Sequence, residues 1–417
     1  MSNRDKTAPT PKLRFPEFRA SDGWWLRQVG DVFKVTRGDV LSMTLVQDDK
    51  TPEAIYPVYS SQTKNNGLSG YYSDFLYEDA ITWTTDGANA GDVNYRPGRF
   101  FCTNVCGVLI NTDGYANPCV AALLNSVSRN YVSYVGNPKL MNGVMAKIAI
   151  PFPTVKEQLR ISDCLSTLDE LIAAQARKVD ALKTHKKGLM QQLFPRDGET
   201  QPRLRFPEFR DAGEWDEVPL SDLIGSLDAG VSVNSGDRPA MGIEIGVLKT
   251  SAVTNGIFES EENKVVFDEI EIGRVKEPVQ RDTIIISRMN TPALVGANAY
   301  VKTSLENIFL PDRLWAAKSK PGICMRFVAF ILGSDKGRAA LTKLAKGSSG
   351  SMKNITKPDV LAFLIMAPSP HEQQRIADCL TSLDDVITAQ IQELESLKTH
   401  KRALMQQLFP SAEALEA

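Results

Sequence analysis

Two long segments of the chain place their apolar residues at alternating intervals of four and three. The spacing runs without a break from Ile161 to Leu193 and again from Ile376 to Leu408. This is the heptad signature of a coiled coil, and it predicts two long helices, over residues 156–195 and 370–410. The predicted seams consist of Ile161, Leu165, Leu168, Ile172, Gln175, Val179, Leu182, Lys186, Leu189 and Leu193 in the first helix, and of Ile376, Leu380, Leu383, Ile387, Gln390, Leu394, Leu397, Lys401, Leu404 and Leu408 in the second.

The same two segments are copies of one another. Residues 157–195 and 372–410 align without a gap at an offset of 215 and agree at 24 of 39 positions. A second repeat, Leu-Arg-Phe-Pro-Glu-Phe-Arg, occurs at residues 13–19 and 204–210, at an offset of 191. These offsets predict a circularly organised duplication with pseudo-two-fold symmetry, in which the end of the second helix lies near the N-terminal arm.

Polar residues interrupt both seams at the same two places, and they favour one direction of pairing. In a parallel pair in register, Lys186 would lie against Lys401, a like-charge contact in the seam. In an antiparallel pair Gln175 still meets Gln390, while each lysine moves close to a cysteine of the other helix. We predict an intramolecular antiparallel coiled coil. The alternative is that each helix packs only on its own domain.

The segments between the repeats do not resemble one another. Both contain short apolar stretches broken by Gly, Asn, Asp and Pro, a pattern typical of strands and turns. We expect strands at residues 56–60, 80–84, 100–106, 108–111, 246–250 and 283–287, and a helix at 117–125. The predicted fold class is α/β (α+β), with an N-terminal arm (1–19), a first domain (20–155), the first long helix (156–195), a linker (196–213), a second domain (214–369), the second long helix (370–410) and a tail (411–417).

Composition narrows the possible functions. The formal net charge is −2, so overall charge gives no argument for nucleic-acid binding, and DNA contact would need local basic loops. The longest apolar run, residues 360–367, has the length of a strand and not of a membrane span. The first residues have no apolar stretch typical of a signal peptide. The expected location is therefore the cytoplasm.

The residues needed for catalysis or metal binding are not found together in the sequence. Cys102 and Cys106 have no second Cys or His pair at ligand spacing, so reduced core thiols are the favoured interpretation of the six cysteines. There is no phosphate-binding loop of the Walker type and no Asn-Pro-Pro-Tyr-like tetrapeptide. All three histidines lie in the predicted helical segments, which leaves no Ser/His or Cys/His pair. We expect no metal, no cofactor and no catalytic residue in this chain.

Polar loops in both domains supply candidates for DNA contact. Amide and guanidinium groups can read base edges, while lysines and hydroxyls can hold phosphates. For any single residue, the alternative is an ordinary solvated turn. The candidates are Ser60, Ser61, Gln62, Lys64, Asn65, Asn66, Thr85 and Asn89 in the first domain, and Lys249, Thr250, Ser251, Arg288, Asn290, Thr291, Lys346, Ser348, Ser349 and Lys353 in the second.

Two unlike domains that alternate with two near-identical helices resemble the specificity (S, or HsdS) subunit of type I restriction-modification systems. The resemblance covers nearly the whole chain. In the second domain, residues 282–288 and 347–355 look like stretches common in the family's target recognition domains, as do residues 56–62 with Asn66 and Gly67 in the first. The entry to each conserved helix matches through Pro153, Glu157, Gln158 and Ile161, and through Pro370, Glu372, Gln373 and Ile376.

The resemblance implies a DNA-reading subunit that performs no catalysis itself. Each target recognition domain would read one half of a bipartite, asymmetric site in double-stranded DNA, and the coiled coil would set the spacer between the halves. It further implies two methylation (M) subunits that use S-adenosylmethionine to modify adenine at N6. Two restriction (R) subunits would use ATP and Mg²⁺, so that the assembled complex is both a methyltransferase and an ATP-dependent endonuclease. The repeated helices would dock the methylation subunits.

Two other functions remain open at this point. The chain could be a coiled-coil adaptor whose two domains bind proteins, which predicts no sequence-dependent affinity for DNA. It could also be a self-sufficient enzyme, for which the missing motifs give no support.

Overall fold

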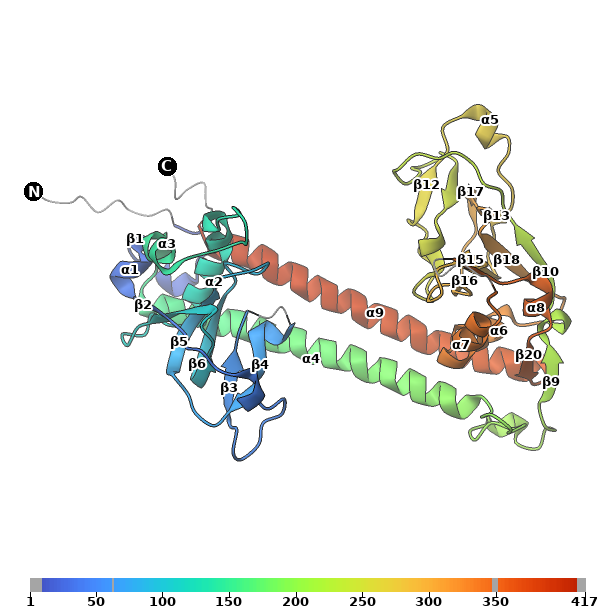
Figure 1. Ribbon diagram of the computed structural model, residues 1–417, viewed down its shortest axis with the longest axis horizontal. Helices are drawn as coiled ribbons and strands as arrows, with labels where there is room; N and C mark the ends of the chain where they lie inside the picture. Colours follow the sequence, from blue (N-terminus) through green and yellow to red (C-terminus); the bar gives the residue numbers. More distant parts are fainter. Residues whose placement is uncertain (1–9, 62–63, 347–351, 411–417) are drawn as a thin grey trace, which may run out of the picture. The chain divides into compact units, whose positions relative to one another are not determined.

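The computed structural model describes residues 10–61, 64–346 and 352–410. Its longest elements are two helices of 39 residues each, α4 (Val155–Leu193) and α9 (Pro370–Leu408) (Figure 1). The chain divides into two compact units, Met1–Val179 with Gln390–Ala417, and Asp180–Ala389. Each unit contains one domain and part of both long helices. We call the domains module 1 (Trp25–Phe152) and module 2 (Asp216–Ala367).

In the first unit, the start of α4 pairs with the end of α9 in opposite directions. Gln175 Nε2 donates to the backbone oxygen of Gln390 at 2.9 Å and to its Oε1 at 3.1 Å. Further along, Lys401 Nζ lies 2.5 Å from Asp169 Oδ1. Residue numbers rise along one helix as they fall along the other, so the pair is antiparallel, and the predicted meeting of the two glutamines is confirmed.

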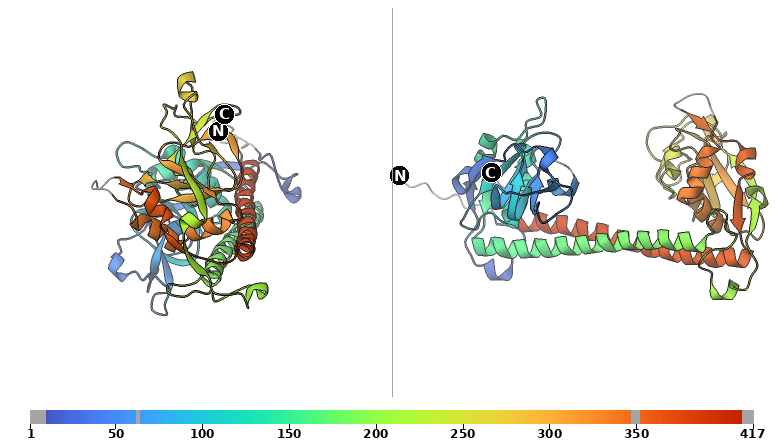
Figure 2. Two further views of the ribbon diagram at one scale, coloured as in Figure 1. Left: turned by 90° about the vertical axis from the view of Figure 1, so that its right-hand side faces the viewer. Right: turned by 60° about the horizontal axis from the view of Figure 1, so that its bottom comes forward.

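The second unit repeats this arrangement with the roles of the helices exchanged. Lys186 of α4 lies 2.6 Å from Asp384 of α9, as Lys401 does from Asp169. The charged partners of the seam lysines are thus aspartates, which the heptad pattern did not identify. Every seam position in both helices is buried or half-buried, as a coiled-coil contact requires. Figures 1 and 2 show the two helices side by side within each unit.

Module 1 is built around a six-stranded sheet with strand order β2-β7-β5-β6-β3-β4. Helix α2 packs on β6, and Asn117 caps this helix by accepting a hydrogen bond from the Val120 N–H. The bounds are β1 (Trp25–Gln28), α1 (Val29–Val32), β2 (Lys34–Arg37), β3 (Tyr56–Tyr59), β4 (Leu68–Tyr72), β5 (Tyr77–Thr84), β6 (Val93–Cys102), β7 (Cys106–Ile110), α2 (Pro118–Val127), α3 (Asn142–Lys147) and β8 (Ala149–Phe152).

Module 2 has a different topology, with two four-stranded sheets ordered β10-β18-β14-β16 and β12-β11-β17-β13. Its bounds are β9 (Asp216–Pro219), β10 (Ile224–Ala229), β11 (Gly246–Leu248), β12 (Asn263–Val265), α5 (Glu269–Ile272), β13 (Pro278–Val279), β14 (Thr283–Ser287), β15 (Met289–Asn290), β16 (Asn298–Val301), β17 (Leu305–Phe309), β18 (Leu314–Ser319), α6 (Met325–Gly333), α7 (Asp335–Lys343), β19 (Lys353–Asn354), α8 (Lys357–Leu361) and β20 (Leu364–Ala367). The unlike sequences therefore fold into unlike sheets.

One predicted strand is wrong. Residues 100–106 do not form a single strand, because β6 ends at Cys102 and the chain turns before β7 begins at Cys106. The Cys106 N–H donates to the Thr103 oxygen at 3.0 Å and closes this turn. Phe100 and Cys106 both face the same buried cluster, which explains why the apolar pattern reads as continuous.

Both modules begin and end in the same way. The first and last strands of module 1 pair antiparallel, with Trp25 opposite Phe152, and those of module 2 do the same, with Asp216 opposite Ala367. The first strands of the two modules, β1 and β9, are related by the offset of 191, and the last strands, β8 and β20, by the offset of 215. Each small sheet therefore pairs one strand that follows the Leu-Arg-Phe-Pro-Glu-Phe-Arg motif with one strand that precedes a long helix. The buried residues Trp24 and Trp215 precede the first strands at equivalent positions.

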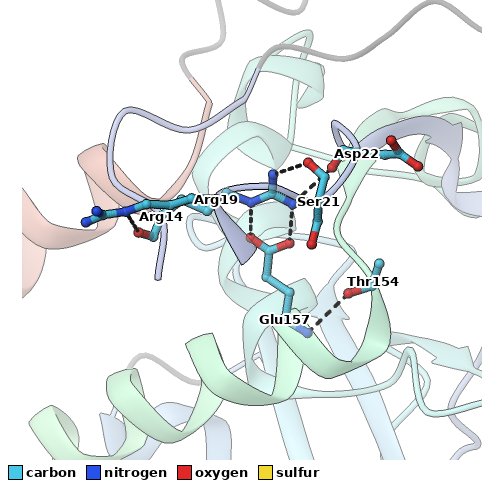
Figure 3. A network of polar contacts seen from close by, with 6 residues as sticks. All are labelled: Arg14, Arg19, Ser21, Asp22, Thr154 and Glu157. Carbon is cyan, nitrogen blue, oxygen red and sulfur yellow. Dashed lines mark hydrogen bonds and ion pairs between the residues drawn. The ribbon is translucent and has the colours of Figure 1, made fainter. Parts of the chain in front are cut away.

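The Leu-Arg-Phe-Pro-Glu-Phe-Arg motif joins the ends of the two long helices in each unit. The Leu13 N–H donates to the Gln407 oxygen at the end of α9, and the Arg14 guanidinium binds Glu157 at the start of α4. Figure 3 shows that Arg14 also donates to the backbone oxygens of Ser21 and Asp22. The N-terminal arm therefore lies at the end of the second helix, as the circular organisation predicts.

The second copy of the motif makes the same contacts. The Leu204 N–H donates to the Gln192 oxygen at the end of α4, and Arg205 binds Glu372 at the start of α9. The second copy follows shortly after the end of α4 along the chain, whereas the first copy contacts the end of α9, which lies far away in the sequence. Two different modules are thus attached to helix ends through the same set of interactions.

Candidate nucleic-acid interface

Two polar loops of module 1 are in contact with one another. Asn89 Nδ2 donates to the Ser61 oxygen at 3.2 Å, which links the loop after β5 to the loop after β3. Ser60 is held from the opposite side, since Thr103 Oγ1 donates to its hydroxyl at 3.0 Å. The structure therefore brings Ser60, Ser61 and Asn89 into one surface, as DNA-contacting loops would require.

The loop after β3 has an unusual backbone. Asn65, Asn66 and Gly67 all have positive φ values, of 51°, 52° and 85°. Asparagine tolerates this left-handed region better than other residues with a side chain, which explains the Asn-Asn-Gly sequence. Both asparagines are exposed. The conformation turns the Asn66 carbonyl toward the sheet, where Arg96 Nη2 donates to it at 2.7 Å.

Arg96 lies on β6 beneath this loop and is buried, with 7% of its surface exposed. Its Nε donates to Thr82 Oγ1 at 3.0 Å, and its guanidinium lies 3.8 Å from the centre of the Tyr59 ring. Burial lowers the pKa of Arg96, although an arginine keeps its charge under physiological conditions. Sequence reasoning missed this residue, because an arginine in a strand segment gives no local sign that it points inward.

A polar cavity of about 270 Å³ opens beside Arg96. It lies between the loop after β3, the strands β5 and β6, and the end of α2. Arg129 on its wall is paired with Asp92 at 2.5 Å, and this interaction raises the pKa of Arg129. The cavity is lined by Ser60, Asn66, Gly67, Thr84, Asp92, Val93, Asn94, Arg96, Asn125 and Arg129.

Three candidates of module 1 do not contribute a described surface. The prediction for Thr85 is wrong, because Thr85 is fully buried and its hydroxyl lies within hydrogen-bond distance of Asp86 Oδ2, at 2.7 Å, and of the Val105 oxygen, at 2.9 Å. Its side chain satisfies the loop from inside and cannot face a ligand. Gln62 and the side chain of Lys64 lie outside the described residues.

In module 2, a short pair of strands brings two candidate loops together. Strand β15 pairs with β19, so that Asn290 lies opposite Lys353. Lys346 and Asn354 form a further bridge at the base of the second loop. The candidates Arg288, Asn290, Lys346 and Lys353 are therefore neighbours, and the exposed Thr291 follows directly. Ser348 and Ser349 lie outside the described residues.

A tryptophan with two cations near its ring lies beside these loops. The Arg288 guanidinium is 5.9 Å from the centre of the Trp315 ring, and Lys357 Nζ is 6.0 Å from it. Arg288 is 4.0 Å from Asp312, and its Nε is buried without a hydrogen-bond partner among the described residues. Sequence reasoning identified Arg288 but missed Trp315 and Lys357, which reach the same place from β18 and α8.

The third candidate loop of module 2 is engaged elsewhere. Lys249 lies 3.5 Å from Glu262, and Ser251 Oγ donates to the same carboxylate at 2.5 Å. The hydroxyl and the lysine lower the pKa of Glu262, so this carboxylate stays ionised and neutralises Lys249. Thr250 between them is half-buried. The structure thus places Lys249, Thr250 and Ser251 in a local network and not in a free basic loop.

The acidic, histidine and cysteine side chains do not form a metal centre in the described parts of the chain. Within residues 10–61, 64–346 and 352–410, no group of three or more His, Cys, Asp and Glu side chains could hold a metal ion. All six cysteines are free thiols. Burial raises the pKa of Cys106 to about 11 and raises the pKa of Cys102 further, so both are protonated and unreactive at neutral pH. Over the same residues, no helix is long and apolar enough to cross a bilayer.

Comparison with known proteins identifies the family. The family model for the type I restriction modification DNA specificity domain matches residues 21–184 and 213–398, which together make up most of the chain. The type I restriction enzyme MjaVIII specificity subunit of Methanocaldococcus jannaschii is 24% identical over 407 residues, covering 94% of this chain and 93% of that protein. The N-terminal part of a type I specificity subunit of Mycoplasma pneumoniae is 39% identical over 143 residues, covering 34% of this chain and 75% of that protein.

Solved structures share the fold. The crystal structure of the S subunit of a type I restriction-modification system from M. genitalium has a TM-score of 0.63 at 18% identity, covering 97% of this chain and 100% of that chain. A second structure, from work on the assembly and conformational transition of a type I system, has a TM-score of 0.53 at 14% identity and covers 93% of this chain and 98% of that one. The chain belongs to the family of type I restriction-modification specificity subunits, and modules 1 and 2 lie in its two DNA specificity domains.

Proposed function

We propose that modules 1 and 2 each read one half of a bipartite, asymmetric target in double-stranded DNA, and that the helices α4 and α9 set the spacer between the halves. The observation that carries this proposal is the equivalent attachment of two unlike modules. Arg14 with Glu157 and Arg205 with Glu372 fix the modules to the helix ends in the same way. Identical supports under different reading surfaces suit a target whose two halves differ in sequence.

Specificity subunits are non-catalytic, and the activity of the complex belongs to methylation and restriction subunits. The candidate surfaces of the modules differ in their chemistry. Module 1 offers hydroxyls and amides around a buried arginine, while module 2 offers Arg288 and Lys357 beside Trp315, with Lys346 nearby and paired with Asp359. Since base edges are distinguished by their donors and acceptors, such different surfaces would select different bases.

The length of the helices supports the spacer role. A helix of 39 residues is about 58 Å long at a rise of about 1.5 Å per residue. Two half-sites on the same side of DNA are separated by about one turn, or roughly 34 Å. Helices of this length are long enough to separate two readers on that scale.

We also propose that the repeated helices bind two methylation subunits. Leu171 of α4 and Val386 of α9 occupy equivalent positions outside the seam and are 50% and 47% exposed. Equivalent apolar positions on a duplicated scaffold can bind two copies of one partner. Two restriction subunits would complete the complex in the cytoplasm, with S-adenosylmethionine, ATP and Mg²⁺ bound by the partners.

Methylome sequencing tests this function directly. The chain is expressed with its methylation subunit in a host that has no adenine methylation of its own. The expected result is one methylated motif in two parts separated by a constant gap. Replacing module 1 with the corresponding module of a relative should change one half of the motif only. A continuous motif would contradict the proposal, and complete absence of sequence-dependent DNA binding would favour the adaptor function.

A further inference from the structure

Arg96 is a buried cation with no acidic partner in the described part of the chain. Its donors bind neutral oxygens, those of Thr82 and Asn66, and its guanidinium lies over the ring of Tyr59. Burying an ion without an opposite charge is unfavourable in free energy, so buried charges are normally paired. The folded protein leaves the charge of Arg96 without such a partner. An anion bound beside Arg96 would supply the missing negative charge.

The cavity beside Arg96 has the chemistry of an anion site. Besides Arg96, its lining residues include Ser60 and Thr84, which carry hydroxyls, and Asn66, Asn94 and Asn125, which carry amides. Asp92 is the only acidic residue among those that line it, and its Oδ1 accepts hydrogen bonds from Arg129 at 2.5 and 3.2 Å. Because Arg129 balances Asp92, the charge of Arg96 leaves the cavity with a net positive charge.

We infer that this cavity binds one backbone phosphate of the DNA duplex, with the Arg96 guanidinium as its charged partner. The inference rests on the proposed DNA-reading function of module 1. The cavity opens beside exposed Asn65 and Asn66 and next to the loop that contains Asn89. A phosphate held there would fix the position of module 1 on the duplex, because phosphate contacts set the register in which nearby side chains meet base edges.

Arg96 also supports the loop through its bond to the Asn66 oxygen, so the variants must separate the two roles. Arg96→Gln removes the charge but keeps an amide that can donate to this oxygen. Asn94→Asp leaves Arg96 in place and adds a carboxylate to the cavity wall. Both variants are expected to lose the phosphate contact. Arg99→Gln is the matched control, since Arg99 lies on the same strand, is exposed and is paired with Glu78.

The first measurement is the salt dependence of DNA binding. The specificity chain assembled with its methylation subunit is titrated with the duplex that carries the methylated motif, at several KCl concentrations. Loss of one phosphate contact reduces the slope of log K against log[salt] by about 0.9. We expect this reduction in Arg96→Gln and Asn94→Asp and no change in Arg99→Gln. Unchanged slopes in both cavity variants would overturn the inference.

The second measurement locates the phosphate. Duplexes carry a single neutral methylphosphonate at successive positions of the half-site that module 1 reads. One position should weaken wild-type binding about tenfold, as expected for loss of a charged hydrogen bond, and should have no further effect in Arg96→Gln or Asn94→Asp. If the effects of the methylphosphonate and of the substitution add at every position, the inference is contradicted, even when both variants bind DNA weakly. That outcome would not count against the proposed sequence-reading function of the wild type.

A third arm distinguishes DNA from a small anion. If inorganic phosphate at millimolar concentration raises the melting temperature of the wild-type chain but not that of Arg96→Gln, and the methylphosphonate effects remain additive, the cavity binds a free anion. That result overturns the assignment to DNA. Failure of the wild-type complex to distinguish its motif from other sequences would instead refute the proposed function of the chain.

Discussion

Arg14 and Glu157 form a two-pronged ion pair, in which Nε and Nη2 donate to the two carboxylate oxygens at 2.7 Å each. Their side chains are 8% and 1% exposed. The pair joins the N-terminal arm to the first turn of α4, and Arg205 repeats it with Glu372 at 2.8 Å. Because Glu157 lies at a helix start, its charge is also stabilised by the helix dipole.

Removing this pair should destabilise the first unit. Arg14→Ala leaves Glu157 buried without its cation, and such a loss costs about 3 kcal/mol or more. Urea unfolding followed by circular dichroism measures the change. The control is Arg19→Ala in the same motif, whose exposed side chain makes one long contact, to the Arg14 oxygen at 3.4 Å. Equal stability of the two variants would show that the ion pair does not hold the arm.

The two seam glutamines should show strong coupling. Gln175→Leu alone removes the donor to both oxygens of Gln390 and is expected to cost about 1 kcal/mol. The double variant Gln175→Leu, Gln390→Leu places two apolar residues in the seam and should be at least as stable as the wild type, because leucines suit these heptad positions. A double-mutant cycle in urea measures the coupling, and simple additivity of the two losses would contradict it.

Much of this arrangement could be predicted from the sequence. The 3.5-residue spacing and the repeated Gln and Lys interruptions are local signals, so the two helices and their antiparallel direction were accessible. Asp169 and Asp384 were not, since acidic residues outside the seam are ordinary on a helix surface. The interaction of Leu13 with Gln407 connects distant segments, and only its equivalence to the nearby pair Leu204 and Gln192 in the repeat indicated it.

The candidate site was less accessible for a physical reason. A polar loop residue has the same sequence context whether it faces solvent or the interior, and Thr85 proved to be buried while Asn65 is exposed. Trp315 and Arg96 lie in strand segments, where burial depends on which side of the sheet carries the core. Their relation to the loops is created by the strand order, which periodicity does not reveal.

The buried thiols should make the chain less stable in alkali. Burial raises the pKa of Cys106 to about 11 and raises the pKa values of Cys102 and Cys119 further, from an ordinary value of 9.0. The folded state therefore keeps protons that the unfolded chain releases above pH 9. Since stability falls with pH wherever the folded state binds more protons, the free energy of unfolding should drop by up to about 1.4 kcal/mol per pH unit for each thiol.

Unfolding in urea at pH 8, 9 and 10 measures this dependence. Cys106→Ala should show a shallower slope than the wild type between pH 9 and 10, whatever its absolute stability. Lysines and tyrosines also titrate in this range, so the comparison of slopes isolates the thiol. Identical slopes would indicate that Cys106 is not protected in the folded chain.

Arg288 should contribute to the half-site that module 2 reads. Arg288→Ala removes the guanidinium beside Trp315 and is expected to weaken binding of the assembled complex by about 1–3 kcal/mol, the value of a base-reading contact. The loss of binding free energy caused by Arg288→Ala should change when bases are substituted in one half-site and stay constant when they are substituted in the other. Competition among duplexes that carry these substitutions measures this dependence. Arg274→Ala is the control, because Arg274 is exposed and paired with Glu271. Equal effects of the two substitutions would place Arg288 outside the reading surface.

Lengthening both helices should lengthen the spacer. Seven residues inserted after Gln175 in α4 and after Gln390 in α9 preserve the heptad seam and add about 10.5 Å to each helix at about 1.5 Å per residue. At about 3.4 Å per base pair, the preferred gap should grow by roughly three base pairs. Three base pairs also turn the duplex by about 100°, so binding to the new site should be weaker than wild-type binding to its own. Methylome sequencing reads the gap. A two-residue insertion at the same places turns the seam on each helix by about 200° and should abolish methylation. An unchanged gap in the seven-residue variant would exclude the helices as the element that sets the spacer.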